Sequence, residues 1–419
     1  MDIKVVITGL GVISPNGIGK NNFVSAIKSG KSGIKKITRF DASEYPVKIA
    51  GEVNDFEPTT FIDRKDTKLI SRTAQFCYAG TKLAIEDADL KIMNEDPYRV
   101  GIIFGTSTGG QEIHEQQLEN FYKKGISSIS PFSPISINYN SAVGYTAAQL
   151  KIKGPNLTVS TGCTSGLNSI CLGFDFIRNN KADIIIAGGA DCPILPFTFN
   201  AFCSARVLSK RNGNPETTSR PFDKERSGYV LSEGAGIVVL ENYEHAIRRN
   251  ANIYGEILGY GITNDGYSLL GMEPEGKEVV ESIKLTLENA GIKEVDYICA
   301  HGSSSVVADK RETKSIKEVF GEKAYSIPIS SIKSMIGQPL SSAGCLQLIT
   351  ALIAINENFI PPTINYEYPD PECDLDYVPN KYREVKVNTA LINSFGMGGN
   401  NVSIIVGKSN GRKYINHSN

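Results

Sequence analysis

Short apolar runs of strand length recur along the chain, and the segments between them carry helical patterns. The runs are rich in β-branched residues and do not alternate with polar positions, which is typical of strands covered on both faces. We therefore predict an α/β fold of parallel strands with helices on both sides. The predicted strands are Val5–Ile7, Val100–Phe104, Leu157–Val159, Ile184–Ala187, Ile237–Leu240, Ile298–Ala300, Ala390–Ile392 and Ser403–Val406.

Two segments, 160–166 and 334–344, place small residues directly before a long apolar helical pattern. They look like counterparts, so we expect a weak internal duplication. The predicted units are residues 1–250, residues 251–410 and a polar tail at 411–419.

Composition and motifs exclude several classes of function. Lys and Arg number 44 and Asp and Glu 45, so a net charge of −1 gives no general reason to bind nucleic acid or an anionic membrane. The uncharged stretches contain too many polar and breaking residues to span a membrane, and the N-terminus lacks the pattern of an export signal, so we expect a cytoplasmic protein. The glycine-rich stretches match no phosphate-binding motif in frame, so no nucleotide site is expected.

Cys163 is the best candidate for a nucleophile among eight cysteines. It lies between the predicted strand Leu157–Val159 and a helix that begins near Thr164, where free amide N–H groups and the helix dipole stabilise a thiolate. A small buried cysteine at a tight turn is equally compatible with this segment alone. The cysteines include no C-x-x-C pair, so neither a zinc site nor a disulfide framework is expected.

His301 stands out among the four histidines because it follows a predicted strand and opens a Gly-Ser turn. Strand ends that feed such loops often hold the reactive groups of α/β folds. His114, His245 and His417 have no visible partner in the sequence, and we interpret them as residues without a catalytic task, the last two solvated.

Several stretches in a fixed order give the sequence a family likeness: 6–11, 161–166 around Cys163, 219–228, 300–305 with Asp309, 333–335 and 393–401. On these stretches the sequence resembles the elongating β-ketoacyl-[acyl carrier protein] synthases, the type II ketosynthases of fatty-acid and polyketide assembly. The resemblance covers nearly the whole chain and implies the duplicated thiolase fold, layered α-β-α-β-α.

The resemblance implies a catalytic centre with one departure from the family pattern. Cys163 matches the cysteine that accepts the acyl chain, His301 a histidine that polarises the malonyl thioester, and Lys333 the lysine that supports this histidine. Gln338 stands where a second histidine is expected. A carboxamide donates a hydrogen bond to a developing oxyanion but cannot become cationic, so we expect acylation of Cys163 to survive even if condensation slows.

The resemblance also assigns residues to substrate binding, and it implies no cofactor or metal beyond the phosphopantetheine of the carrier. Ser303 and Ser305 replace threonines that bind the phosphopantetheine arm, and they keep the hydroxyls. Met397 replaces a phenylalanine gate, so altered chain selection is expected. The same acyl pocket is predicted to include Phe202, Thr108 and Phe395.

An acyl carrier protein is the expected partner, and the family implies a homodimer or a heterodimer with a related ketosynthase. The carrier is acidic, so its docking needs a local cationic patch. A charge run is more often only a solvated surface, and the docking role depends on the resemblance. The predicted docking residues are Arg64, Lys65, Lys68, Arg206 and Lys210.

Three functions remain open at this point. The first is a β-ketoacyl synthase-like acyltransferase that joins carrier-bound acyl and malonyl groups by decarboxylative Claisen condensation, in fatty-acid or specialised lipid or polyketide synthesis. The second is a non-condensing acyltransferase or thioester hydrolase on the same scaffold. The third is a non-catalytic partner resembling a chain-length factor, against which the presence of Cys163, His301 and Lys333 together argues.

Overall fold

Two five-stranded units with the same strand order form the centre of the structure, a computed structural model that describes residues 3–409. The first unit has the order β6-β5-β7-β8-β1 and the second the order β11-β10-β14-β15-β9. The strands of the first are β1 (Val5–Ser14), β5 (Val100–Gly105), β6 (Asn156–Val159), β7 (Ile184–Asp191) and β8 (Gly234–Asn242). Those of the second are β9 (Gly255–Asn264), β10 (Tyr297–Cys299), β11 (Ile329–Ser330), β14 (Thr389–Phe395) and β15 (Asn400–Gly407).

The two units also repeat the same strand directions. β5 pairs in parallel with β6 and β7, and β10 pairs in parallel with β11 and β14. β8 is antiparallel to β7 and β1, as β15 is to β14 and β9. The internal duplication is therefore present in the fold, whereas the prediction of an all-parallel sheet is wrong. Helices cover both faces, so antiparallel strands also lack the alternation that usually identifies them.

A short antiparallel contact between β1 and β9 joins the two units into one eleven-stranded sheet. The eleventh strand is β2 (Gly17–Ile18), which pairs with β1. Two small sheets lie apart from it, formed by β3 (Lys35–Lys36) with β4 (Ile49–Ala50) and by β12 (Phe359–Ile360) with β13 (Arg383–Glu384).

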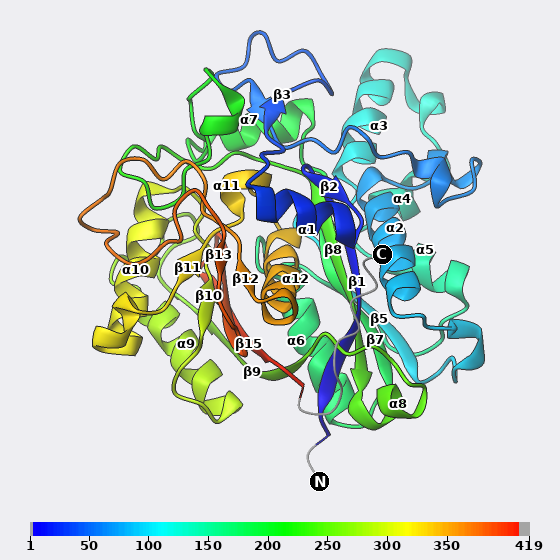
Figure 1. The fold of residues 1–419 in the computed structure, drawn as a ribbon. Helices are drawn as coiled ribbons and strands as arrows, with labels where there is room; N and C mark the ends of the chain where they lie inside the picture. Colours follow the sequence, from blue (N-terminus) through cyan, green and yellow to red (C-terminus); the bar gives the residue numbers. More distant parts are fainter. Residues whose placement is uncertain (1–2, 410–419) are drawn as a thin grey trace.

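Five layers of secondary structure are visible in Figure 1. The helices α6 (Ser165–Arg178) and α12 (Ser342–Glu357) form the middle layer between the two units. One outer layer contains α2 (Arg72–Asp87) and α5 (Ser141–Leu150), and the other contains α9 (Lys277–Ala290) and α10 (Val306–Phe320). This arrangement confirms the predicted α-β-α-β-α layering.

The remaining helices lie at the ends and edges of these layers. They are α1 (Lys20–Ser29), α3 (Gln111–Lys124), α4 (Ser133–Ile137), α7 (Pro196–Ser204), α8 (Tyr243–Arg248) and α11 (Lys333–Ile336). Among residues 3–409, no helix is both long and apolar enough to cross a membrane. The predicted tail at 411–419 and His417 lie outside the described residues.

The starts of the two central helices touch each other at a glycine. A Cβ atom on Gly166 would lie 2.3 Å from the backbone oxygen of Ser341 and 2.5 Å from Cys345 Sγ. Only a residue without a side chain fits this contact. The two segments that the sequence identifies as counterparts therefore meet in the middle of the molecule, and each brings its preceding turn to the same place.

Candidate active site

Cys163 lies in the turn between β6 and α6, directly before the helix cap at Thr164. Burial raises the pKa of the Cys163 thiol. Hydrogen bonds from the Gln338 side chain and the Met397 backbone, and the charge of Lys333, oppose this effect without outweighing it. The prediction that the helix start makes this sulfur anionic is therefore wrong for the free protein, in which the thiol is protonated at neutral pH.

His301 follows β10 and is fixed by its backbone and its ring. Its N–H donates to Glu312 Oε1 at 2.8 Å, and its carbonyl accepts from Lys333 Nζ at 2.5 Å. Burial and the charges of Lys333 and Arg311 lower the pKa of His301 well below its usual value. Nδ1 accepts the Phe395 N–H at 3.2 Å, so the proton of the neutral ring is on Nε2. His301 is therefore a neutral N–H donor.

Gln338 follows α11 and is held by its own backbone. Its N–H donates to the Val230 carbonyl at 2.7 Å, and its carbonyl accepts the Ser232 N–H at 3.1 Å. The side chain is 2% exposed and makes a hydrogen bond with the Cys163 thiol. Its Oε1 is buried without a hydrogen-bond partner among the described residues. The carboxamide therefore points toward the sulfur.

Four of the predicted substrate residues lie at the end of β14 or in the segments that follow β10 and β14. Ser303 is buried, and Ser305 caps α10 by accepting the Ala308 N–H at 3.4 Å. The ring of Phe395 lies 5.1 Å from that of His301. The backbone of Met397 reaches the Cys163 thiol.

The other two predicted pocket residues belong to the first half of the chain. Phe202 on α7 packs against the same apolar cluster as Cys163. Thr108, in the loop after β5, is bonded through its N–H and its hydroxyl to Asp191 Oδ1 at 2.9 and 2.8 Å. Asp191 also accepts the Ser341 N–H at 2.9 Å, which ties this loop to the start of α12.

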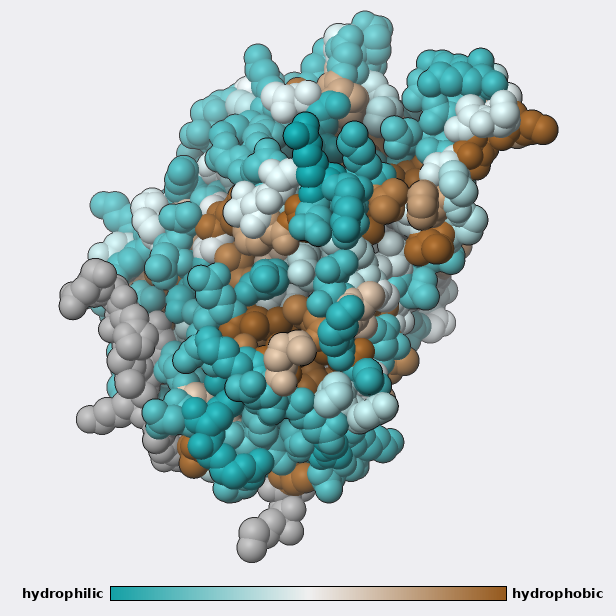
Figure 2. Space-filling model, turned by 90° about the vertical axis from the view of Figure 1, so that its right-hand side faces the viewer, coloured by the Kyte–Doolittle hydropathy of each residue, from teal (hydrophilic) through white to brown (hydrophobic). Residues whose placement is uncertain are grey.

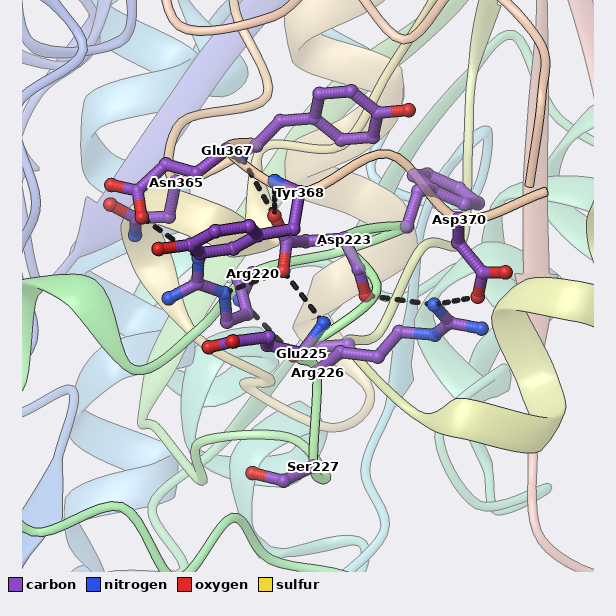
Figure 3. A network of polar contacts seen from close by, with 12 residues as sticks. Arg220, Asp223, Glu225, Arg226, Ser227, Asn365, Glu367, Tyr368 and Asp370 are labelled. Atoms are coloured by element: carbon purple, nitrogen blue, oxygen red, sulfur yellow. Dashed lines mark hydrogen bonds and ion pairs between the residues drawn. The ribbon is translucent and has the colours of Figure 1, made fainter. Parts of the chain in front are cut away.

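Ion pairs of the 219–228 stretch lie next to the serine loop, residues 303–305, that follows His301. Arg226 Nη1 donates to Asp370 Oδ2 at 2.7 Å, and Arg220 Nε donates to Asp223 Oδ1 at 2.9 Å (Figure 3). The Arg220 N–H donates to the Ser304 hydroxyl at 3.1 Å. This network gives the 219–228 stretch, on which part of the resemblance rests, a structural role.

The five predicted docking residues are all exposed. They form two groups rather than one patch. Residues 64–68 directly precede α2, whereas Arg206 and Lys210 follow α7, and Figure 1 shows these two regions well apart at the top of the molecule. Within one chain, the predicted cationic patch is therefore divided.

Two buried residues at the centre are missing from the sequence predictions. Glu312 on α10 accepts the N–H groups of His301 and Gly302, each at 2.8 Å. Gln347 on α12 accepts from Lys333 Nζ at 2.8 Å. Each is a single polar residue within a helical pattern, so the neighbouring sequence does not indicate that it belongs to the site.

The prediction that His245 is solvated is wrong. Its side chain is only 12% exposed and lies between two carboxylates, with Nδ1 2.8 Å from Glu241 and Nε2 3.0 Å from Glu95. Glu95 precedes His245 by 150 residues, so the sequence does not reveal this pairing. His114 is half-buried on α3.

Family models match both halves of the chain. The model of the β-ketoacyl synthase N-terminal domain matches residues 2–246, and that of the C-terminal domain matches residues 254–367. The chain therefore belongs to the β-ketoacyl synthase family, as the motifs indicated, and it is an acyltransferase of the ketosynthase type.

Individual relatives are similar over almost their full length. The chain is 43% identical over 407 residues to the 3-oxoacyl-[acyl-carrier-protein] synthase 2 of Coxiella burnetii, covering 97% of this chain and 98% of the relative. It is 43% identical over 403 residues to the enzyme of the same name from Synechocystis sp., covering 96% and 97%.

Solved structures agree with the fold. A type II PKS ketosynthase, in complex with its acyl-carrier protein and bound to the hexaketide, superposes with a TM-score of 0.91 at 32% identity, covering 98% of this chain and all of that one. The ishigamide ketosynthase/chain length factor superposes with a TM-score of 0.92 at 34% identity and the same coverage.

Proposed function

We propose that this chain is an elongating ketosynthase that accepts an acyl group on Cys163 and condenses it with a malonyl group, both delivered by an acyl carrier protein. The observation that carries the proposal is that the Gln338 carboxamide adjoins the Cys163 thiol, while the backbone of residues 395–396 adjoins both Cys163 and His301. The Gln338 carboxamide contacts the Cys163 thiol, and His301 is a neutral imidazole whose donor is Nε2–H. The names of the relatives support carrier-bound substrates.

In the first step, Cys163 Sγ attacks the carbonyl carbon of the acyl thioester. The bond to the pantetheine sulfur breaks, and the proton of the Cys163 thiol leaves with the pantetheine thiol. The Met397 and Gln338 groups that hydrogen-bond to the sulfur favour its anionic form during the attack.

In the second step, malonyl thioester loses CO₂, and the electron pair of the broken bond forms an enolate. His301 Nε2–H and Gln338 Nε2–H stabilise the enolate oxygen, for which a neutral donor is sufficient. The enolate carbon attacks the acyl carbon, and the Cys163 thioester bond breaks to give the β-ketoacyl product and a free thiolate. That thiolate takes a proton from water.

The proposed assembly is a homodimer that uses the free edge of β6. Among residues 3–409 this strand pairs only with β5, and Asn156 and Leu157 are exposed along it. Apolar side chains are also exposed on the neighbouring α3–α4 region, a face on which Figure 2 shows brown surface. They are Leu118, Phe121, Tyr122, Ile126, Ile129, Phe132, Ile135 and Tyr139.

Three further proposals concern the partners and the location of the protein. A heterodimer with a related ketosynthase is the alternative assembly, in line with the ishigamide ketosynthase/chain length factor to which the chain is similar. Carrier docking is assigned to Arg64, Lys65, Lys68, Arg206 and Lys210, all of which are exposed. A cytoplasmic location is proposed because none of the eight cysteines is in a disulfide.

The decisive experiment combines the protein with acyl-carrier and malonyl-carrier and follows acyl-enzyme, CO₂ and β-ketoacyl product by mass spectrometry. Product formation supports the condensing enzyme. Acyl-enzyme without product supports a non-condensing acyltransferase or hydrolase, and no acylation supports a chain-length-factor-like partner. Cys163→Ala is the control, since it removes the acyl acceptor.

Gln338→His tests the departure from the family pattern. We expect faster decarboxylation if the carboxamide is the weaker of the two donors. An unchanged rate in a folded variant would count against an oxyanion role for this position.

A further inference from the structure

Gln347 is a fully buried carboxamide on α12 whose two ends make different hydrogen bonds. Its Nε2 donates to the carbonyls of Ala300 at 2.6 Å and Asn393 at 2.9 Å, with a longer contact to Cys299 at 3.2 Å. Its Oε1 accepts from Lys333 Nζ at 2.8 Å. The side chain thus connects α12 with α11 and with the ends of β10 and β14.

These contacts leave the amide only one orientation. Three carbonyl oxygens surround its nitrogen, and a rotated amide would place Oε1 against them and an N–H group against the ammonium. Lys333 therefore always faces an oxygen. Its other hydrogen bond is to the carbonyl of His301, so both acceptors hold it toward the catalytic histidine.

Both acceptors of Lys333 are uncharged. None of the ion pairs within 4.0 Å among residues 3–409 includes Lys333. The nearby carboxylate Glu312 acts on it only through space, since its oxygens accept the N–H groups of His301 and Gly302. The positive charge of Lys333 is thus held in place without being neutralised by a direct partner.

We propose that Gln347 is a positioning residue that holds the Lys333 ammonium against the His301 carbonyl while leaving its charge free to act on the catalytic centre. This inference rests on the proposed function, because it concerns the same site. The free charge acts on two groups: it favours the anionic form of Cys163, and it disfavours protonation of His301. A carboxylate at position 347 would cancel it.

The test measures alkylation of Cys163 by iodoacetamide in the full-length protein at pH 6.5, with peptide mass spectrometry to separate this cysteine from the other seven. Alkylation requires the thiolate but neither carrier nor condensation. The groups that titrate or carry charge around Lys333 are His301, Glu312, Cys299, Cys163 and Asp309, and none of them is substituted, so the two position-347 variants differ only in the group at that position.

Gln347→Glu introduces a negative charge, and Gln347→Met removes the same hydrogen bonds without one. We expect alkylation to be about tenfold slower in Gln347→Glu than in Gln347→Met, since a nearby charge shifts a pKa by about one unit or more. Equal rates would overturn the proposal, because a purely structural role depends on the lost hydrogen bonds alone.

A matched control is available on α2. Gln75 is also buried, and its Nε2 also donates to two carbonyls, those of Thr67 at 2.9 Å and Ile70 at 3.3 Å. Gln75→Glu should alkylate within about twofold of the wild type. A tenfold decrease here would show that any buried Gln→Glu change slows the reaction, which would overturn the interpretation.

If Gln347→Glu does not fold, Gln347→Met alone still tests the positioning. With Lys333 no longer held toward His301, we expect kcat for condensation to fall at least fivefold while KM changes less than twofold. An unchanged kcat would overturn the proposal. Failure of the proposed function looks different, because the wild type itself would then give no product while its Cys163 would still be alkylated.

Discussion

His301 and His245 are both largely enclosed, but their neighbours are of opposite kinds. The charges that lower the pKa of the His301 ring are those of the cations Lys333 and Arg311, while the Glu312 carboxylate is bonded to the backbone N–H and one ring nitrogen accepts a backbone N–H. Around His245 the charged groups include two carboxylates, one at each ring nitrogen. Burial and the cations lower the pKa of His301, whereas the bond to Glu241 raises the pKa of His245.

The comparison shows that burial, reinforced by cations, lowers the pKa of one imidazole, whereas carboxylates at both ring nitrogens outweigh burial and raise the pKa of the other. Neutral His301 is a hydrogen-bond donor at the catalytic centre. His245, whose pKa the carboxylates raise, links α8 to the segment before β5 through its hydrogen bond to Glu95. One histidine therefore serves the reaction and the other serves the fold, and four substitutions test this division.

His301→Ala should have the largest effect. It removes one of the two enolate donors, so we expect condensation to slow by about 10²–10³-fold while acylation of Cys163 persists. Product and acyl-enzyme are measured by mass spectrometry. His301→Asn retains an N–H donor and should retain more activity than the alanine variant; equal losses would contradict a donor role.

Lys333→Met should have the next largest effect. Burial lowers the pKa of Lys333 to about 8, so wild-type condensation should decline above about pH 8 as the ammonium loses its proton. The variant should be about 10- to 100-fold slower at pH 7 and lack this alkaline decline. It should gain an acidic decline, because without the cation the pKa of His301 rises toward its usual value. Condensation rates of both proteins from pH 5.5 to 9.5 test the alkaline and the acidic decline.

His245→Gln should reduce stability and leave the chemistry intact. A histidine with a raised pKa contributes stability that is fully present below its unfolded-state pKa and is lost as the pH rises through its folded-state pKa. We expect a loss of about 1–3 kcal/mol in the free energy of unfolding at pH 6 and a smaller loss at pH 9. Denaturant unfolding at both values measures it, and a large change in condensation would break the comparison.

Glu95→Gln should have the smallest effect. It removes one of the two carboxylates at His245, so the pKa of His245 should fall. Glu95 is partly exposed, and we expect the loss in unfolding free energy to be about 0.5 kcal/mol at pH 6. A loss as large as that of His245→Gln would mean that Glu241 contributes little.

Local patterns predicted much of the fold. Strand-length runs and two Gly-Ser turns before apolar helices are signals within a few residues, and they located β5, β7, β8, α6 and α12. Strand direction was mispredicted, because burial on both faces removes the alternation. β9 was missed, since its glycines interrupt the apolar run.

The residues of the candidate site likewise fall into those that a local sequence pattern indicates and those that depend on distant contacts. Cys163 and His301 stand at strand ends, where local sequence indicates reactivity, and the family motifs added Lys333 and Gln338. Gln347 could not be predicted, because its partners come from three distant segments. The protonation state of Cys163 also depends on such packing, so the helix start alone gave the wrong answer.

The contact between Gly166 and Ser341 places the beginnings of two equivalent helices back to back. The turn before α6 supplies the sulfur of Cys163, and the turn before α12 supplies the carboxamide of Gln338, so the two repeated halves contribute different groups to one site. A single substitution at position 338 therefore changes the donor without changing the turn and helix that hold Cys163. Such an enzyme can vary the hydrogen-bond donor of one half and retain in the other half the cysteine that accepts the acyl group.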